Sequence, residues 1–197
     1  MHFNSAFEAK ILHPLRSVVG TVVRDVQYWI LPTDQEYFQL DIPNASGIQG
    51  VYLSFDYFKL SFSWGFETML RTPKNYHHIE VFIAGTEEED ACPDELKALL
   101  RISAVNSLQW RDVLSQRLIS AEVYSYESSP QAIRMLFEND AIVIAIGYSE
   151  RDDSILIGDG DDLLILNDTE WRDESKYVLK GWVRVFSVEA DNRLGLR

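Results

Sequence analysis

Cysteine, basic residues and long apolar runs are all scarce in this chain of 197 residues. The one cysteine, Cys92, cannot form a disulfide within the chain, which favours a reducing compartment. No apolar run approaches the roughly 20 residues that a transmembrane helix needs. The first ten residues lack the basic stretch and apolar run of a secretory signal. We therefore expect a cytoplasmic protein that is not inserted in a membrane.

Positive charge is also in short supply. The chain has 18 Lys and Arg against 31 Asp and Glu, which gives a net charge of −13 and a pI near 4.6. Nucleic-acid phosphates demand Lys and Arg, so this balance argues against unaided nucleic-acid binding. Apolar residues make up 46% of the chain and aromatic residues 12%, as is ordinary for a folded protein.

The clearest local pattern is alternation of apolar and polar residues with a period of two. Residues 58–66 place Phe58, Leu60, Phe62 and Trp64 on one face, with Ser and Lys between them. Successive side chains of a β-strand point to opposite faces, so this pattern predicts a half-buried strand. Residues 51–55 alternate in the same way, and a turn at 56–57 would join the two strands into a hairpin.

A second stretch of the chain repeats this hairpin pattern. Residues 133–147 align with residues 51–65 without a gap, at an offset of 82 residues (137 − 55). Three weaker matches extend the alignment. They place Val81 and Ile83 on Leu163 and Ile165 (offset 82), residues 100–102 on 183–185 (offset 83), and Val22, Val23 and Tyr28 on Leu118, Ile119 and Tyr124 (offset 96). The different offsets place 14 extra residues in the first copy, between Tyr28 and Val51.

These matches predict an internal duplication, with a first β unit at 1–105 and a second at 106–197. We expect a mainly β fold with minor helix: two pseudo-repeated antiparallel units of about five strands each, barrel- or sandwich-like, packed on a shared core or a large interface. A short helical turn should begin each unit, at residues 9–17 and 107–115. Residues 93–100 begin with Pro and acidic residues, so helix competes with strand there.

Several patterns could carry chemistry, and each has a plainer interpretation. The carboxylates of residues 149–153 and 158–162 could hold a cation, but Asp159 and Gly160 are also typical of a turn between two strands. His77 and His78 are adjacent, so in a strand they point to opposite faces, and we expect an exposed strand start there. We predict no metal and no cofactor.

The sequence also disfavours nucleophilic catalysis by cysteine or serine. The acidic neighbours of Cys92 disfavour its thiolate and raise its pKa. No serine lies in a nucleophile-elbow frame, and no glycine-rich phosphate loop occurs. We therefore expect a protein that is not an enzyme.

Acidic loops are the remaining candidate site. The acidic loop at residues 86–90 of the first unit aligns with the loop at residues 169–173 of the second unit. A third acidic loop, at residues 158–162, also belongs to the second unit. If a barrel placed them on one rim, they would steer a basic partner. Trp171 lies among acids and is either a partner-binding anchor or a cover over its own sheet edge. The candidate partner-binding residues are Glu87, Glu88, Glu89, Asp90, Asp159, Asp161, Asp162, Glu170, Trp171 and Asp173.

The duplicated hairpin at residues 133–147, preceded by the short helical stretch 110–114, resembles small bacterial β-rich immunity-type proteins of polymorphic toxin systems. That resemblance implies a non-enzymatic protein that binds and blocks a cognate toxin, with the acidic loops facing a basic partner. The alternative is a small-ligand-binding or structural β module. A dimer through edge strands such as residues 177–188 is compatible with the sequence.

Overall fold

The structure is a computed structural model, and it describes residues 8–34, 47–65, 78–83, 99–126, 129–149, 155–158, 160 and 162–190. Strands dominate these residues, and the sheets are antiparallel throughout. In this described part of the chain, none of the helices has the length and apolar composition that crossing a bilayer requires.

The first sheet contains five strands. In chain order they are β1 (Val23–Ile30), β2 (Ile48–Phe55), β3 (Lys59–Gly65), β4 (His78–Ile83) and β5 (Leu100–Ser103). Their order across the sheet is β4-β3-β2-β1-β5. The predicted β2–β3 hairpin is present, and its turn is closed by the Phe55 N–H, which donates to the Phe58 carbonyl at 2.7 Å.

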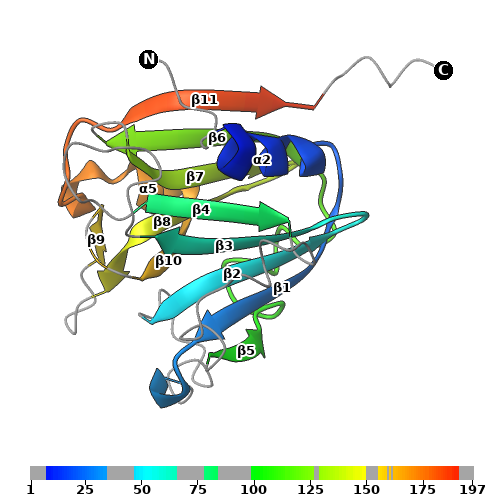
Figure 1. Ribbon diagram of the computed structural model, residues 1–197, viewed down its shortest axis with the longest axis horizontal. Helices are drawn as coiled ribbons and strands as arrows, with labels where there is room; N and C mark the ends of the chain where they lie inside the picture. Colours follow the sequence, from blue (N-terminus) through cyan, green and yellow to red (C-terminus); the bar gives the residue numbers. More distant parts are fainter. Residues whose placement is uncertain are drawn as a thin grey trace.

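The second sheet contains six strands. They are β6 (Leu118–Tyr126), β7 (Ser129–Phe137), β8 (Ala141–Ser149), β9 (Ile155–Ile157), β10 (Leu163–Asn167) and β11 (Val183–Glu189). The order is β10-β8-β7-β6-β11, with β9 beside the end of β8. This order repeats that of the first sheet. The predicted fold class is thus confirmed as mainly β with two antiparallel sheets, and the sheets are not closed into a barrel (Figure 1).

The register of the two central hairpins agrees with the offset of 82. Val51 lies opposite Phe62 in the first sheet, and Ile133 lies opposite Ile144 in the second. The turn hydrogen bond also recurs, since the Phe137 N–H donates to the Asp140 carbonyl at 2.8 Å. Phe55 and Phe137 therefore occupy equivalent places.

Of the three outer matches, the one between β5 and β11 holds where the strands begin, since Leu100 lies opposite Ile30 and Val183 opposite the equivalent Ser125, which preserves the offset of 83. The other two were wrong by one or two residues. Val23 lies opposite Phe55, and Leu118 lies opposite Phe137, so β1 and β6 correspond at an offset of 95 (118 − 23) and not 96. Tyr28 is consequently equivalent to Val123, and both face the main core. A slip of one residue exchanges the two faces of a strand, which is why Tyr124 lies on the opposite face. Strands β4 and β10 correspond at an offset of 84 residues and not 82. Ile79 lies opposite Trp64, and Leu163 lies opposite Ile146, which is the equivalent of Trp64 in the second sheet.

The two sheets meet at one corner through symmetric contacts. Val22 and Arg117 form an isolated antiparallel bridge between the starts of β1 and β6. A turn carboxylate binds the backbone of each bridge residue: Asp56 accepts from the Val22 N–H at 3.0 Å, and Glu138 accepts from the Arg117 N–H at 3.3 Å. These four residues are pairwise equivalent at offsets of 95 and 82. The corner is therefore a local two-fold arrangement of the two units.

Each unit begins with a short helical stretch that packs on the core. In the first unit it comprises η1 (Glu8–Leu12) and α2 (His13–Val18), and in the second it is a series of turns over residues 105–115. The buried side chains of Leu15 and Trp110 are equivalent at the offset of 95. Trp110 donates its indole N–H to the Tyr28 hydroxyl at 2.7 Å, which links the second unit's turn to the first sheet.

One buried apolar core contains residues from both sheets and both helical stretches. The inward-facing residues of the central hairpins, including Val51, Leu53, Ile133 and Met135, are fully shielded from solvent. Of the stretch 93–100, for which helix competed with strand, Leu100 is the first residue of β5, and residues 93–98 lie outside the described residues. The remaining short elements are η2 (Pro32–Asp34), α5 (Asp168–Arg172) and η4 (Glu174–Lys176).

Candidate partner-binding surface

Residues 168–182, here called the cover segment, contact the face of the second sheet that points away from the main core. The segment starts where β10 ends, and a capping box defines the start of its first helix. The Asn167 side chain accepts from the Glu170 N–H at 2.9 Å, and the Glu170 side chain accepts from the Asn167 N–H at 3.0 Å. This arrangement satisfies backbone donors that a short helix leaves unpaired.

Trp171 anchors the cover segment. It is only 6% exposed and lies in a second, smaller apolar cluster with Ala132, Val143, Leu164 and Leu166 of the sheet. Three aromatic rings surround it, with centroid distances between 5.1 and 5.3 Å: those of Tyr124, Tyr177 and Trp182. Of the two alternatives for Trp171, the structure shows the cover over its own sheet.

Tyr177 and Trp182 stabilise the part of the cover segment that follows Trp171 through side-chain hydrogen bonds to backbone carbonyls. The Tyr177 hydroxyl donates to the Trp171 carbonyl, and the Trp182 indole N–H donates to the Leu179 carbonyl at 2.9 Å. Burial raises the pKa of the Tyr177 hydroxyl, which keeps it protonated and able to donate. Gly158, with φ of +100°, allows a close approach here, because a Cβ at this position would lie 2.9 Å from Leu179.

An ion-pair network joins the cover segment to the sheet. Arg134 on β7 donates to Asp168 at 2.8 Å and to Glu122 on β6 at 3.1 Å. Two more exposed arginines complete the network: Arg172 binds Asp168 at 2.7 Å, and Arg184 binds Glu122 at 2.6 Å. The side chains of Arg134, Glu122 and Asp168 are 15%, 12% and 25% exposed, so its centre is largely shielded from water.

The network keeps both carboxylates ionised. Burial on its own would raise the pKa of Glu122 and Asp168. Hydrogen bonds from Arg184, Tyr124 and Arg134 to Glu122, and from Arg134 and Arg172 to Asp168, outweigh it, and the pKa of each carboxyl is lowered. The sequence analysis missed this network. Its one signal was that Glu122 and Arg134 become cross-strand neighbours once the β6–β7 hairpin is aligned.

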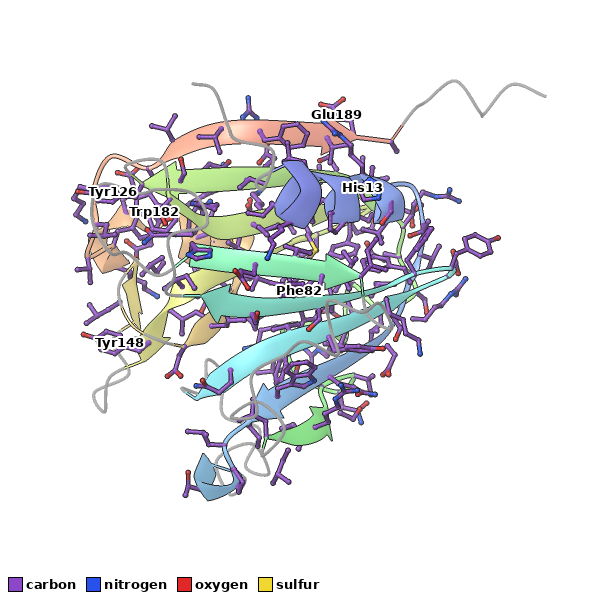
Figure 2. The ribbon with its side chains drawn as sticks, viewed as in Figure 1. His13, Phe82, Tyr126, Tyr148, Trp182 and Glu189 are labelled. Carbon is purple, nitrogen blue, oxygen red and sulfur yellow. The ribbon has the colours of Figure 1, made fainter. Side chains whose placement is uncertain are left out.

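The exposed side of the cover segment, together with the first residue of β11, combines carboxylates with apolar side chains. Asp173 and Glu174 are exposed, and Val178 and Val183 are 43% and 55% exposed. Asp173 caps η4: its carboxylate accepts from the Ser175 hydroxyl and N–H, which lowers the pKa of Asp173. Figure 2 shows the labelled Trp182 and Tyr126 side chains at the same end of the second sheet as this surface.

Asp162 has a structural partner in the first unit. Its carboxylate accepts from the Gly47 N–H at 3.0 Å and from the Gln49 side chain at 2.6 Å, and so connects the start of β10 to the start of β2. Asp162 precedes β10, whereas Glu170 and Asp173 follow it. The structure therefore places these predicted site residues at opposite ends of one strand and not on a common barrel rim.

The other predicted site residues, Glu87, Glu88, Glu89, Asp90, Asp159 and Asp161, lie outside the described residues. So does most of the excess negative charge. The described residues include 12 Lys and Arg and 15 Asp and Glu, a difference of −3 out of the chain's −13. Within residues 168–184, four acidic and four basic side chains balance. Long-range attraction of a basic partner would therefore arise mainly from other parts of the chain.

The structure corrects one expectation about histidine. His78 begins β4 but is buried, 4% exposed, and its Nε2 lies 3.2 Å from a Glu80 carboxylate oxygen. His77 and the side chain of Trp64 are outside the described residues. Within the described part of the chain, no group of three or more His, Cys, Asp and Glu residues has a metal-binding arrangement.

Comparisons with protein-family models, with curated proteins and with solved structures give no match to this chain.

Proposed function

We propose that this chain is a non-enzymatic protein-binding protein, and that it acts as an immunity protein that blocks a cognate toxin. The observation that carries the proposal is the exposed part of residues 173–183, which contains the carboxylates of Asp173 and Glu174 and the solvent-exposed apolar side chains of Val178 and Val183. Apolar contact area with flanking charges is the composition of a protein-binding patch.

The support beneath this patch favours recognition without rearrangement. Trp171, Tyr177 and Trp182 pack against one another, and Arg134 ties the start of the segment to the sheet. A surface that is already ordered loses little conformational entropy on binding, so more of its contact energy contributes to affinity. The net charge of −13 adds long-range attraction for a basic toxin domain and speeds the encounter.

The test uses a basic toxin domain encoded beside this protein's gene as the binding partner. Titration calorimetry against the double variant Asp173→Asn with Glu174→Gln should show binding about tenfold weaker, or about 1.4 kcal/mol. Asparagine keeps the capping oxygen at position 173, so the fold of η4 should be retained. Val183→Ser should weaken binding by a similar factor, because it removes an exposed apolar contact.

The matched control is Asp112→Asn, which removes a 67% exposed carboxylate from the turns at residues 105–115 and leaves residues 168–183 unchanged. It should bind as the unchanged protein does. Equal affinity of all variants for the toxin would place the binding surface elsewhere. Failure of the unchanged protein to bind the toxin or to protect cells that produce it would overturn the proposed function.

A further inference from the structure

Strand β11 stands at one end of the strand order of the second sheet. It pairs with β6 on one side, and among the described residues no strand pairs with its other side. With seven residues it is longer than the other strands that end the sheet orders, β4, β5 and β10, which have six, four and five. A long open edge presents unpaired N–H and C=O groups that can bind another strand.

The hydrogen bonds to β6 determine which backbone groups of β11 face outward. The Ala190 N–H donates to the Ile119 carbonyl at 2.8 Å, just beyond the end of the strand. In an antiparallel pair the backbone groups of successive residues alternate between the partner strand and the opposite side. The backbone N–H and C=O groups of Ser187 and Glu189 therefore point to the open edge.

A bulge gives this edge a self-complementary pattern of side chains. The register of β11 on β6 shifts between Arg184 and Phe186. Because of this shift, Arg184, Ser187 and Glu189 share the outer face, while Phe186 and Val188 lie partly buried against the main core. Arg184 thus lies near one end of the outer face and Glu189 at the other. Figure 2 shows Glu189 at the end of β11 on the upper margin of the molecule.

We propose that the β11 edge binds a second copy of this chain, with the two β11 strands antiparallel about a two-fold axis at Ser187. Phe186 then lies opposite Val188 of the second copy twice. Because Val185 is the extra residue of the bulge and has no partner in the register, the next pair outward is Arg184 with Glu189 of the second copy, also formed twice. The two Ser187 residues exchange backbone hydrogen bonds across the axis. Opposite charges on facing strands stabilise such a pair, and the apolar pairs extend the core across the interface.

Sedimentation velocity over a concentration series tests the proposal with the full chain. The unchanged protein should shift from monomer to dimer as concentration rises. Ser187→Pro should remain monomeric, because proline removes the outward N–H, while an edge strand tolerates proline where its N–H faces solvent. Ser187→Ala, the matched control, retains the N–H and should dimerise as the unchanged protein does.

Glu189→Arg provides a second test that leaves the backbone unaltered. It places like charges opposite each other across the axis, and the dimer dissociation constant should rise at least tenfold. Circular dichroism and the urea midpoint should show that each variant remains folded. A protein that stays monomeric at every concentration, or a dimer that persists unchanged in both Ser187→Pro and Glu189→Arg, would overturn the proposal.

Discussion

Among individual residues, Ser115 has the most unusual backbone. Its φ of 68° is the one positive value among the described residues other than glycine, and its equivalent in the first unit is Gly20, with φ of 91°. Both residues precede the corner where the sheets meet, and their N–H groups donate to equivalent carbonyls, Ser115 to Val23 and Gly20 to Leu118. The corner requires a left-handed residue in each unit, and only the first unit has glycine there.

This comparison predicts that Ser115→Gly stabilises the protein. The left-handed conformation costs a non-glycine residue about 1–2 kcal/mol, and the added freedom of glycine in the unfolded chain offsets part of that. The free energy of unfolding in urea should rise by about 0.5–1 kcal/mol. Gly20→Ala is the reciprocal change and should lower it by about 1–2 kcal/mol. A loss of stability in Ser115→Gly would contradict the equivalence of the two positions.

Arg134 compensates the charge of both shielded carboxylates, Glu122 and Asp168. Arg134→Met should lower the free energy of unfolding by about 2 kcal/mol, less than for a fully buried pair because the three side chains retain some exposure. Arg172→Met is the matched control. Arg172 binds the same Asp168 but is 70% exposed, so its removal should cost at most about 0.5 kcal/mol.

The same ion-pair network should make the free energy of unfolding depend on pH in the acidic range. The lowered pKa values of Glu122 and Asp168 mean that the folded protein holds fewer protons than the unfolded chain. Their contribution is complete above the ordinary values of 4.5 and 3.8 and is lost as the pH falls through the lowered values. Urea unfolding at a series of pH values should show this loss in the unchanged protein and a smaller one in Arg134→Met. Equal losses in both proteins would mean that Arg134 does not lower these pKa values.

At the scale of elements, the cover segment depends on one side chain. Trp171→Ala should lower the free energy of unfolding by about 3 kcal/mol, because it leaves a cavity between the segment and the sheet. Hydrogen exchange of residues 168–182 should accelerate more than that of β7 and β8. Val178→Ala, at a 43% exposed position of the same segment, should change stability by less than about 0.5 kcal/mol. Unaltered exchange of the segment in Trp171→Ala would contradict its role as anchor.

Elements differed in how well the sequence predicted them. The central hairpins were predicted in the correct register, because one face of each is apolar and a tight turn fixes the pairing. Strands β1 and β6 were misaligned by one residue, since β1 has buried apolar residues on both faces, Tyr28 and Ile30 toward the main core and Trp29 on the other. Bulges in the β1–β2 and β6–β7 pairings further obscure the alternation.

The candidate site was less predictable because it depends on contacts between distant parts of the chain. Trp171 could be recognised as unusual, but only the sheet beneath it decides that it is buried. Asp162 belonged to an acidic run, yet its partners Gly47 and Gln49 come from the other unit. The sequence does not distinguish a carboxylate that faces a partner from one that is bound within the fold by an arginine, a backbone N–H group or an amide.

At the scale of the whole molecule, equivalent residues of the two units are alike in polarity on the inner faces of the sheets and differ in polarity on the outer faces. Equivalent inward positions are apolar in both, as in Val51 and Ile133 or Phe62 and Ile144. Equivalent outward positions differ: Ser61 and Ser63 of the first sheet correspond to Val143 and Ala145 of the second. A common core thus supports two outer sheet faces of different composition, and the cover segment packs on the apolar one.

The central claim is that the two units share one register around that core, and cross-strand contacts measured by NMR test it most directly. The turn hydrogen bonds make Tyr52–Ser61 and Arg134–Val143 non-hydrogen-bonded pairs, whose Hα atoms approach closely. The account predicts strong Hα–Hα contacts for both pairs, with Tyr28 and Val123 side chains contacting the shared core. Hα contacts displaced by one residue in either hairpin, or Tyr124 in the place of Val123, would contradict it.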